Sequence, residues 1–202
     1  MNRTERRKAD SSKPPDRRRV IVYATIGILA VLVVAAIALS SRTPKSASDA
    51  PMYAELKTGQ DAPKFSVSAT GGPVSVPVSD GKPVLLEVFA TWCPHCQHET
   101  AVLNKLFAKY GGQVHFVAVS GSEQGMDGSS EASQADVMNF VSRFGVRYPV
   151  AYDGSLDVAK KYLQGGYPTI VVIGKDNKIL AVRDGEITEK QLSDDLNKSL
   201  KA

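Results

Sequence analysis

The sequence predicts an α/β domain built on a mixed β-sheet and preceded by one transmembrane helix. Three observations predict this organisation. Residues 20–39 form an uncharged apolar run, short apolar strands alternate with amphipathic helices from about residue 59, and the two cysteines lie three residues apart. The chain has 202 residues, which suits one globular domain with extensions.

The N-terminal region predicts a membrane anchor. Residues 1–19 carry eight Lys or Arg and three acids, a charge of +5, so the rest of the chain sums to −1 of the net +4. Val20–Leu39 contains no charge, and a helix of that length covers roughly 30 Å, the thickness of a hydrocarbon core. The basic tail is expected to stay cytoplasmic, which places the C-terminal domain outside the cytoplasm, periplasmic or at the cell surface. A cleaved secretory signal is the alternative, although its apolar region is usually shorter.

The excess positive charge lies in the tail, so the folded part has no net basic charge with which to bind nucleic acid. No nucleic-acid partner is therefore expected. Residues 40–58 are rich in Ser, Ala, Pro and Lys and are expected to form a flexible linker. An ordered extension near Met52–Leu56 is the alternative for the end of this segment.

The globular domain is expected at residues 59–202. Alternating runs at Phe65–Ser68 and Val74–Val78 flank two glycines and predict a hairpin. The apolar run Val84–Ala90 predicts a central strand that is covered on both faces. The remaining expected elements are a helix from Pro94 to Gly111, a strand at Val114–Val119, helices at Ser133–Phe144 and Leu156–Tyr162, a hairpin of Thr169–Ile173 and Ile179–Val182, and a last helix capped by Thr188 and Gln191.

The segment Cys93-Pro94-His95-Cys96 predicts a reactive dithiol. Backbone N–H groups and the positive end of the following helix favour an anion, so the Cys93 thiol is expected to ionise readily and to act as the nucleophile. Cys96 lies one turn later and can close a short disulfide with Cys93. Pro94 and His95 lie between them and are expected to tune the pair. Cysteines so close together cannot form a disulfide that cross-links distant parts of a domain.

A metal site is the alternative use of these thiols. Structural zinc needs four ligands, and the chain offers only His98 and His115 beyond the motif. We therefore expect no metal and no cofactor, and His98 is interpreted as a solvated helix residue. Copper capture by the two thiols and a histidine stays open, since Cu(I) accepts two thiolates, so a copper chaperone is a rival function.

The segment Phe89–Cys96, with Trp92 directly before the dithiol, resembles thioredoxin-fold oxidoreductases. Residues 59–202 resemble the TlpA/ResA branch of membrane-anchored thioredoxins. The resemblance implies a thioredoxin fold with an N-terminal hairpin and a helix–strand insertion, here Ser133–Val150. It also implies thiol–disulfide exchange with client proteins. Trp92 is expected to pack beside the dithiol, and the Gly/Ser-rich stretch Gly121–Ser133 is expected to be a mobile surface loop.

Two further site elements follow from the resemblance. Pro168 is expected to be cis and to face the dithiol, so that Tyr167, Pro168 and Thr169 bind substrate; a trans proline starting an edge strand is the alternative. Glu87 lies six residues before Cys93 and is expected to exchange a proton with Cys96. A carboxyl in apolar surroundings has a raised pKa, which suits this role. The alternative is that Glu87 reaches solvent or a lysine such as Lys82 or Lys178.

The direction of electron flow is open at this point. Cys-Pro-His-Cys is the motif of strongly oxidising DsbA-like proteins, whereas TlpA/ResA-like proteins are associated with reduction, for example of apocytochrome c. We expect a reductase that is served by a membrane thiol donor, because the scaffold resemblance covers more of the chain; a DsbA-like oxidase with a membrane acceptor is the alternative. A peroxidase of the peroxiredoxin type needs Thr or Ser at position 90, which is Ala90.

Overall fold

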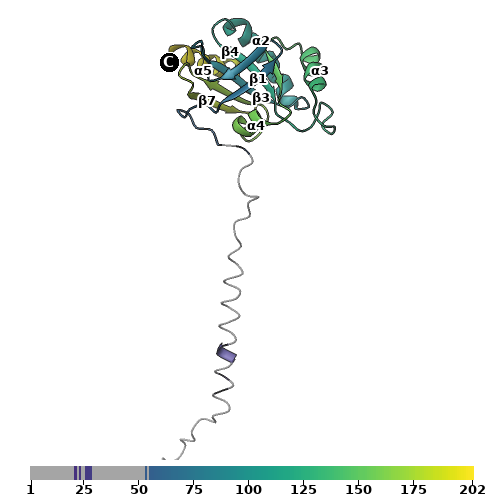
Figure 1. Cartoon of the computed structure of the whole chain (residues 1–202), viewed down its shortest axis with the longest axis vertical. Helices are drawn as coiled ribbons and strands as arrows, with labels where there is room; N and C mark the ends of the chain where they lie inside the picture. The colour runs from purple at the N-terminus through teal and green to yellow at the C-terminus, as the bar shows by residue number, and fades with distance from the viewer. Residues whose placement is uncertain (1–20, 22, 24–25, 29–52, 54) are drawn as a thin grey trace, which may run out of the picture. The chain divides into compact units, whose positions relative to one another are not determined.

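The computed structural model describes residues 21, 23, 26–28, 53 and 55–202. The unit Pro51–Ala202 is built on a seven-stranded sheet in the order β2-β1-β5-β4-β3-β6-β7 (Figure 1). The strands are β1 (Phe65–Ala69), β2 (Gly72–Val76), β3 (Val84–Phe89), β4 (His115–Ser120), β5 (Val150–Tyr152), β6 (Thr169–Ile173) and β7 (Ile179–Asp184). The helices are α2 (Pro94–Tyr110), α3 (Gln134–Phe144), α4 (Asp157–Tyr162) and α5 (Glu189–Lys201). The predicted α/β arrangement is confirmed.

The sheet is mixed. β3 pairs in parallel with β4 and antiparallel with β6, and β4 continues in parallel to β5. The predicted N-terminal hairpin is present as β1 and β2, and it joins the sheet through an antiparallel pairing of Ala69 with Ala151 in β5. The expected helix–strand insertion therefore consists of α3 and β5, and its strand connects the hairpin to the central strands.

β3 lies inside the sheet, between β4 and β6, and all six of its residues are buried, as its apolar sequence predicts. Successive side chains of a strand point to opposite faces. Leu85 and Phe89 join the core cluster that contains residues of α2, α3 and α5. Val84 and Leu86 join the cluster that contains residues of α4. Glu87 is two residues from both Leu85 and Phe89, so its side chain points to the same face, which α2 covers.

Helices lie on both sides of the sheet, with α2 and α4 on opposite sides in Figure 1. Leu103 of α2 and Leu196 of α5 are fully buried on one face, and Tyr162 of α4 is fully buried on the other. Burying apolar area at about 25 cal/mol per Å² is the main favourable contribution to such a core. The dithiol helix α2 is therefore held on the sheet by packing along its whole length.

Two helices begin with the side-chain caps that the sequence predicts. Ser133 and Asp136 form a reciprocal capping box at α3, and Thr188 and Gln191 form one at α5. Each box satisfies backbone N–H groups that have no partner within the helix. Gly145 ends α3 in the left-handed conformation that glycine adopts without steric cost.

The linker boundary needs a correction. Leu56, inside the segment expected to be flexible, is buried at 8% exposure and belongs to a core cluster. Its N–H group donates to the side chain of Gln164 at 3.1 Å. The domain therefore begins before residue 59, as the alternative of an ordered extension near Met52–Leu56 implies.

The predicted basic tail and most of Val20–Leu39 lie outside the described residues. Within that span, Ile21, Tyr23, Ile26 and Ile28 are helical and between 58% and 72% exposed. Across the described part of the chain, no helix combines the length and the apolar character needed to cross a bilayer.

Candidate redox site

The dithiol lies at the carboxyl end of β3, where the chain turns into α2. Cys93 is the residue that precedes the helix, and Pro94 occupies its first turn without wasting an N–H group. The N–H group of Cys93 donates to Ala90 O at 3.1 Å, and its carbonyl accepts the first helical bond from Gln97. The central strand and the helix together fix the position of the Cys93 sulfur.

The two cysteines differ in exposure. Cys93 retains 4% of its surface, whereas Cys96 has none. The sulfurs are not bonded to one another, so the structure describes the dithiol form and the disulfide stays a prediction. Burial and then the nearby Glu87 carboxylate raise the pKa of the Cys96 thiol well above its ordinary value. Cys93 is thus the sulfur that a partner can reach, and Cys96 needs help to lose its proton.

The loop before β6 faces Cys93. The Tyr167–Pro168 peptide bond is cis, as predicted, and Tyr167 O lies 3.5 Å from the Cys93 sulfur. Thr169 is fully buried, and its hydroxyl donates within its own loop to the carbonyls of Gln164 and Gly166. The side chain of Thr169 therefore stabilises the loop, while client binding by residues 167–169 stays a prediction.

Trp92 and Tyr167 form an aromatic wall beside the dithiol, with ring centroids 5.9 Å apart at an interplanar angle of 85°. Both side chains hydrogen-bond the segment after β4: Trp92 Nε1 donates to Ser122 Oγ at 2.8 Å, and the Tyr167 hydroxyl donates to Gly121 O. The segment Gly121–Ser133, expected to be a mobile surface loop, is instead attached to the site at its start, where Gly121 and Ser122 are buried. It also borders a cavity of about 440 Å³ lined by Ser122 and Glu131, among others.

Glu87 is buried on the sheet face that α2 covers, with 2% of its surface exposed. The Tyr148 hydroxyl donates to Oε2 at 3.4 Å, and Oε1 has no hydrogen-bond partner among the described residues. Burial, reinforced by the charge of Glu99, raises the pKa of Glu87 to about 8. The alternative of a lysine partner is wrong for Lys178, which pairs with Asp61 at 2.8 Å.

Glu99 is a second buried acid that the sequence analysis missed. It is 1% exposed, its Oε2 accepts the N–H group of Ile187 at 2.9 Å, and burial raises its pKa to about 7. The signal was its spacing: residues three or four apart on a helix share a face, so Glu99 shares the buried face of Cys96 and Leu103. The face of α2 that carries Cys96 therefore carries one buried carboxyl, and Glu87 of β3 is a second, both with a pKa raised toward neutral pH.

His95, between the cysteines, hydrogen-bonds an acid that the sequence did not indicate. Its Nδ1 lies 2.6 Å from Glu186 Oε1, and Nδ1 of His98 lies 3.3 Å from the same oxygen. Both imidazoles are mostly exposed. His98 is solvated, as interpreted from the sequence, but it has an acidic partner.

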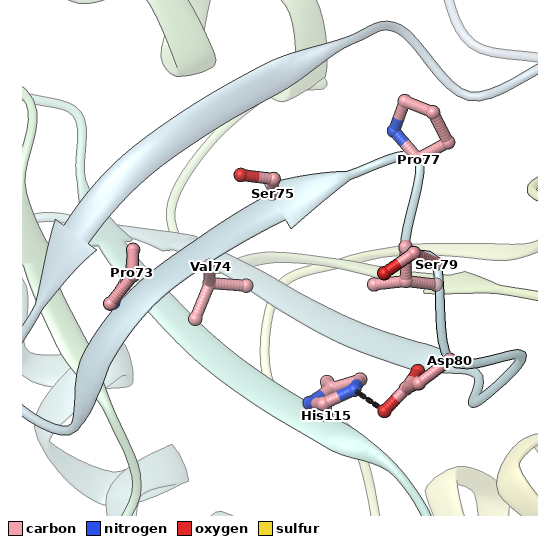
Figure 2. Close-up of a pocket in the computed structure, with 8 residues that line it drawn as sticks. Pro73, Val74, Ser75, Pro77, Ser79, Asp80 and His115 are labelled. Carbon is pink, nitrogen blue, oxygen red and sulfur yellow. Dashed lines mark hydrogen bonds and ion pairs between the residues drawn. The ribbon is translucent and has the colours of Figure 1, made fainter.

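No cluster of three or more candidate ligands suited to a metal ion occurs in the described part of the chain. A second cavity, of about 280 Å³, lies beside the β1–β2 hairpin, where His115 Nε2 is 2.8 Å from Asp80 Oδ2 (Figure 2). His115 begins β4, so this cavity lies at the opposite end of the parallel strands from the dithiol. It is not part of the redox site.

Comparison with known proteins places this site in a family. The Redoxin family model matches residues 57–200. The chain belongs to the Redoxin family. Within it, the chain is 32% identical to thiol-disulfide oxidoreductase ResA of Bacillus thuringiensis (strain Al Hakam) over 146 residues, which is 71% of this chain and 79% of that protein. It is 31% identical to ResA of Bacillus subtilis (strain 168), over 70% of this chain and 75% of that protein.

Solved structures agree with this assignment. The crystal structure of a putative thiol:disulfide interchange protein DsbE from Chlorobium tepidum has 25% sequence identity and a TM-score of 0.62, covering 72% of this chain and 99% of its own. The Redoxin domain described here is thus a TlpA/ResA-like thioredoxin-fold protein, and it is a thiol–disulfide oxidoreductase.

Proposed function

We propose that Cys93 and Cys96 reduce disulfides of client proteins outside the cytoplasm, on a domain tethered to the membrane. The observation that carries this proposal is the placement of Cys93 at the start of α2, opposite the cis-Pro168 loop, with Tyr167 O 3.5 Å from its sulfur. A client chain that lies along this loop presents its disulfide to the more exposed cysteine.

The reaction runs in two exchanges. The Cys93 thiolate attacks one sulfur of the client disulfide, the client S–S bond breaks, and the other client sulfur leaves and takes a proton. Cys96 then loses its proton and attacks the Cys93 sulfur, which breaks the mixed disulfide and releases the second client thiol. Two electrons pass to the client, and the enzyme is left with a Cys93–Cys96 disulfide that a membrane thiol donor must reduce.

Glu87 supports the second exchange as the proton acceptor for Cys96. The Cys96 thiol is fully buried and reluctant to ionise, and Glu87 is close enough to raise its pKa. Only the ionised carboxylate can accept the proton, and burial raises the pKa of Glu87 to about 8. The second exchange should therefore accelerate as the pH rises toward 8.

The proposed direction of electron flow and the proposed location of the domain are supported by different observations. The resemblance to the TlpA/ResA branch favours reduction, of apocytochrome c or copper-site cysteines among others. The uncharged span Val20–Leu39, preceded by a basic tail, favours a single-pass anchor with an N-terminus in the cytoplasm. Four described residues of that span, Ile21, Tyr23, Ile26 and Ile28, are helical and expose large apolar side chains, which suits contact with lipid.

Trapping identifies the client proteins and tests which cysteine is the nucleophile. Cys96→Ala removes the sulfur that resolves the mixed disulfide, so client proteins should accumulate on Cys93, and Cys93→Ala is the matched control that should trap none. Equal yields from the two variants would contradict the assignment of Cys93 as nucleophile. Equilibration of the wild-type protein with glutathione then decides the direction: a strongly oxidising, DsbA-like potential would contradict the reductase proposal.

A protease-protection experiment tests the location. In intact cells stripped of any outer layer, external protease should remove the domain and leave an epitope fused to Met1 intact. Protection of the domain would contradict the proposed topology.

A further inference from the structure

The segment between β7 and α5 is fixed to the redox site at two points. The N–H group of Gly185 donates to Pro168 O at 2.9 Å, in the loop that faces Cys93. The N–H group of Ile187 donates to Oε2 of the buried Glu99 at 2.9 Å. Glu186 lies between these two anchors, so its backbone position is set by the cis-proline loop on one side and by the dithiol helix on the other.

The Glu186 side chain reaches across to the dithiol motif. Its Oε1 lies 2.6 Å from Nδ1 of His95 and 3.3 Å from Nδ1 of His98, one turn further along α2. Both bonds lower the pKa of Glu186, so the carboxylate is charged at neutral pH. The histidine of the Cys-Pro-His-Cys motif is therefore bonded to an anion from another element of the fold.

We propose that Glu186 is a positioning residue that holds His95 and lowers the reduction potential of the Cys93–Cys96 pair. The proposal accounts for a conflict in this chain. Cys-Pro-His-Cys is the motif of strongly oxidising DsbA-like proteins, whose reduced form is stabilised, yet the scaffold is ResA-like. The Glu186 carboxylate places a negative charge beside the motif and holds Nδ1 of His95. This inference rests on the proposed exchange through Cys93 and Cys96.

The sign follows from charge. In the equilibrium with glutathione, the disulfide form accepts two electrons from two glutathione thiols and yields the dithiol and one glutathione disulfide. A negative charge beside the motif disfavours the Cys93 thiolate and hence the dithiol form. Replacing Glu186 with Gln removes that charge and keeps a hydrogen-bond acceptor for His95.

The test compares Glu186→Gln with the wild type in the purified full chain, by equilibration with glutathione. The dithiol should gain roughly threefold in the exchange constant, because the carboxylate is partly exposed and screened, and this equals about 14 mV at 29.6 mV per tenfold change. Ultraviolet absorbance of the thiolate at one fixed pH should rise as well, which a purely structural role would not produce. Glu189→Gln is the matched control, since Glu189 is exposed and pairs with Lys105 on the surface.

A second background isolates the route through His95. In a His95→Gln chain the Glu186 carboxylate loses its bond to His95 and is screened more fully by solvent, so Glu186→Gln should change the exchange constant by much less than threefold. An unchanged constant in the wild-type background, or an equal change in both backgrounds, would overturn the inference while leaving the proposed exchange intact. A chain that fails to exchange with glutathione at all would overturn the proposed function and this inference with it.

Discussion

Replacing Glu87 with Gln should change how the stability of the domain depends on pH. Glu87 is 2% exposed, and its pKa is raised from 4.5 to about 8 in the folded protein. Between these values the native state holds a proton that the unfolded chain releases. Stability therefore falls as the pH rises through this window, and the cost is absent below pH 4.5.

The magnitude follows from the two pKa values. Each pH unit inside the window costs about 1.4 kcal/mol, so the cumulative loss of unfolding free energy is about 3 kcal/mol between pH 4.5 and pH 7. Gln cannot titrate, so this loss should be missing from the variant. The buried amide carries its own cost, which is the same at both pH values and cancels when the two are compared.

Urea denaturation of the reduced protein at several pH values measures the effect. The stability of Glu87→Gln relative to the wild type should improve by about 3 kcal/mol from pH 4.5 to pH 7. Glu131→Gln, at an exposed position, is the control and should show no such trend. Parallel stability curves for wild type and Glu87→Gln would refute the reasoning, because they would mean that the carboxyl ionises as it does in water.

Three further predictions concern stability, each measured as a change in unfolding free energy by urea denaturation. Gly121→Ala places a Cβ 2.5 Å from Ala159 Cβ and should destabilise by about 1–3 kcal/mol; a neutral change would mean that this contact yields easily. Thr188→Ala removes the α5 cap and should cost about 1 kcal/mol, whereas Thr188→Ser should restore most of it. Leu196→Ala empties a fully buried position and should cost about 2–5 kcal/mol, and a loss below 1 kcal/mol would contradict its burial.

Elements with a strong local signal could be predicted from the sequence. The continuous apolar sequence of β3 by itself indicates a strand buried on both faces. The capping boxes of α3 and α5 each involve residues within four positions of one another, so they can also be recognised locally. The cis form of Pro168 was predicted from the family resemblance and not from its own neighbours. Boundaries differ by one or two residues at several strands, as expected where hydrogen bonding fades at element ends.

The missed features depend on contacts between distant parts of the chain. Glu186 reaches His95 across 91 positions, and no pattern around either residue indicates the pairing. Glu99 shares a helix face with Cys96 and Leu103, but an acid is rarely buried, so only the packing of α2 shows that this carboxyl is inside. The Val76–Pro77 bond is also cis, and neither its neighbours nor the family resemblance indicated it.

The unequal exposure of the two sulfurs has a consequence for how long a client stays attached. Small thiols in the surroundings can reach only the 4% of Cys93 that is exposed, and they cannot reach the fully buried Cys96. Release is then timed from inside the protein, by how fast Cys96 gives up its proton. The lifetime of the captured client is for that reason a property of the enzyme's interior, largely insulated from the thiol content of the medium.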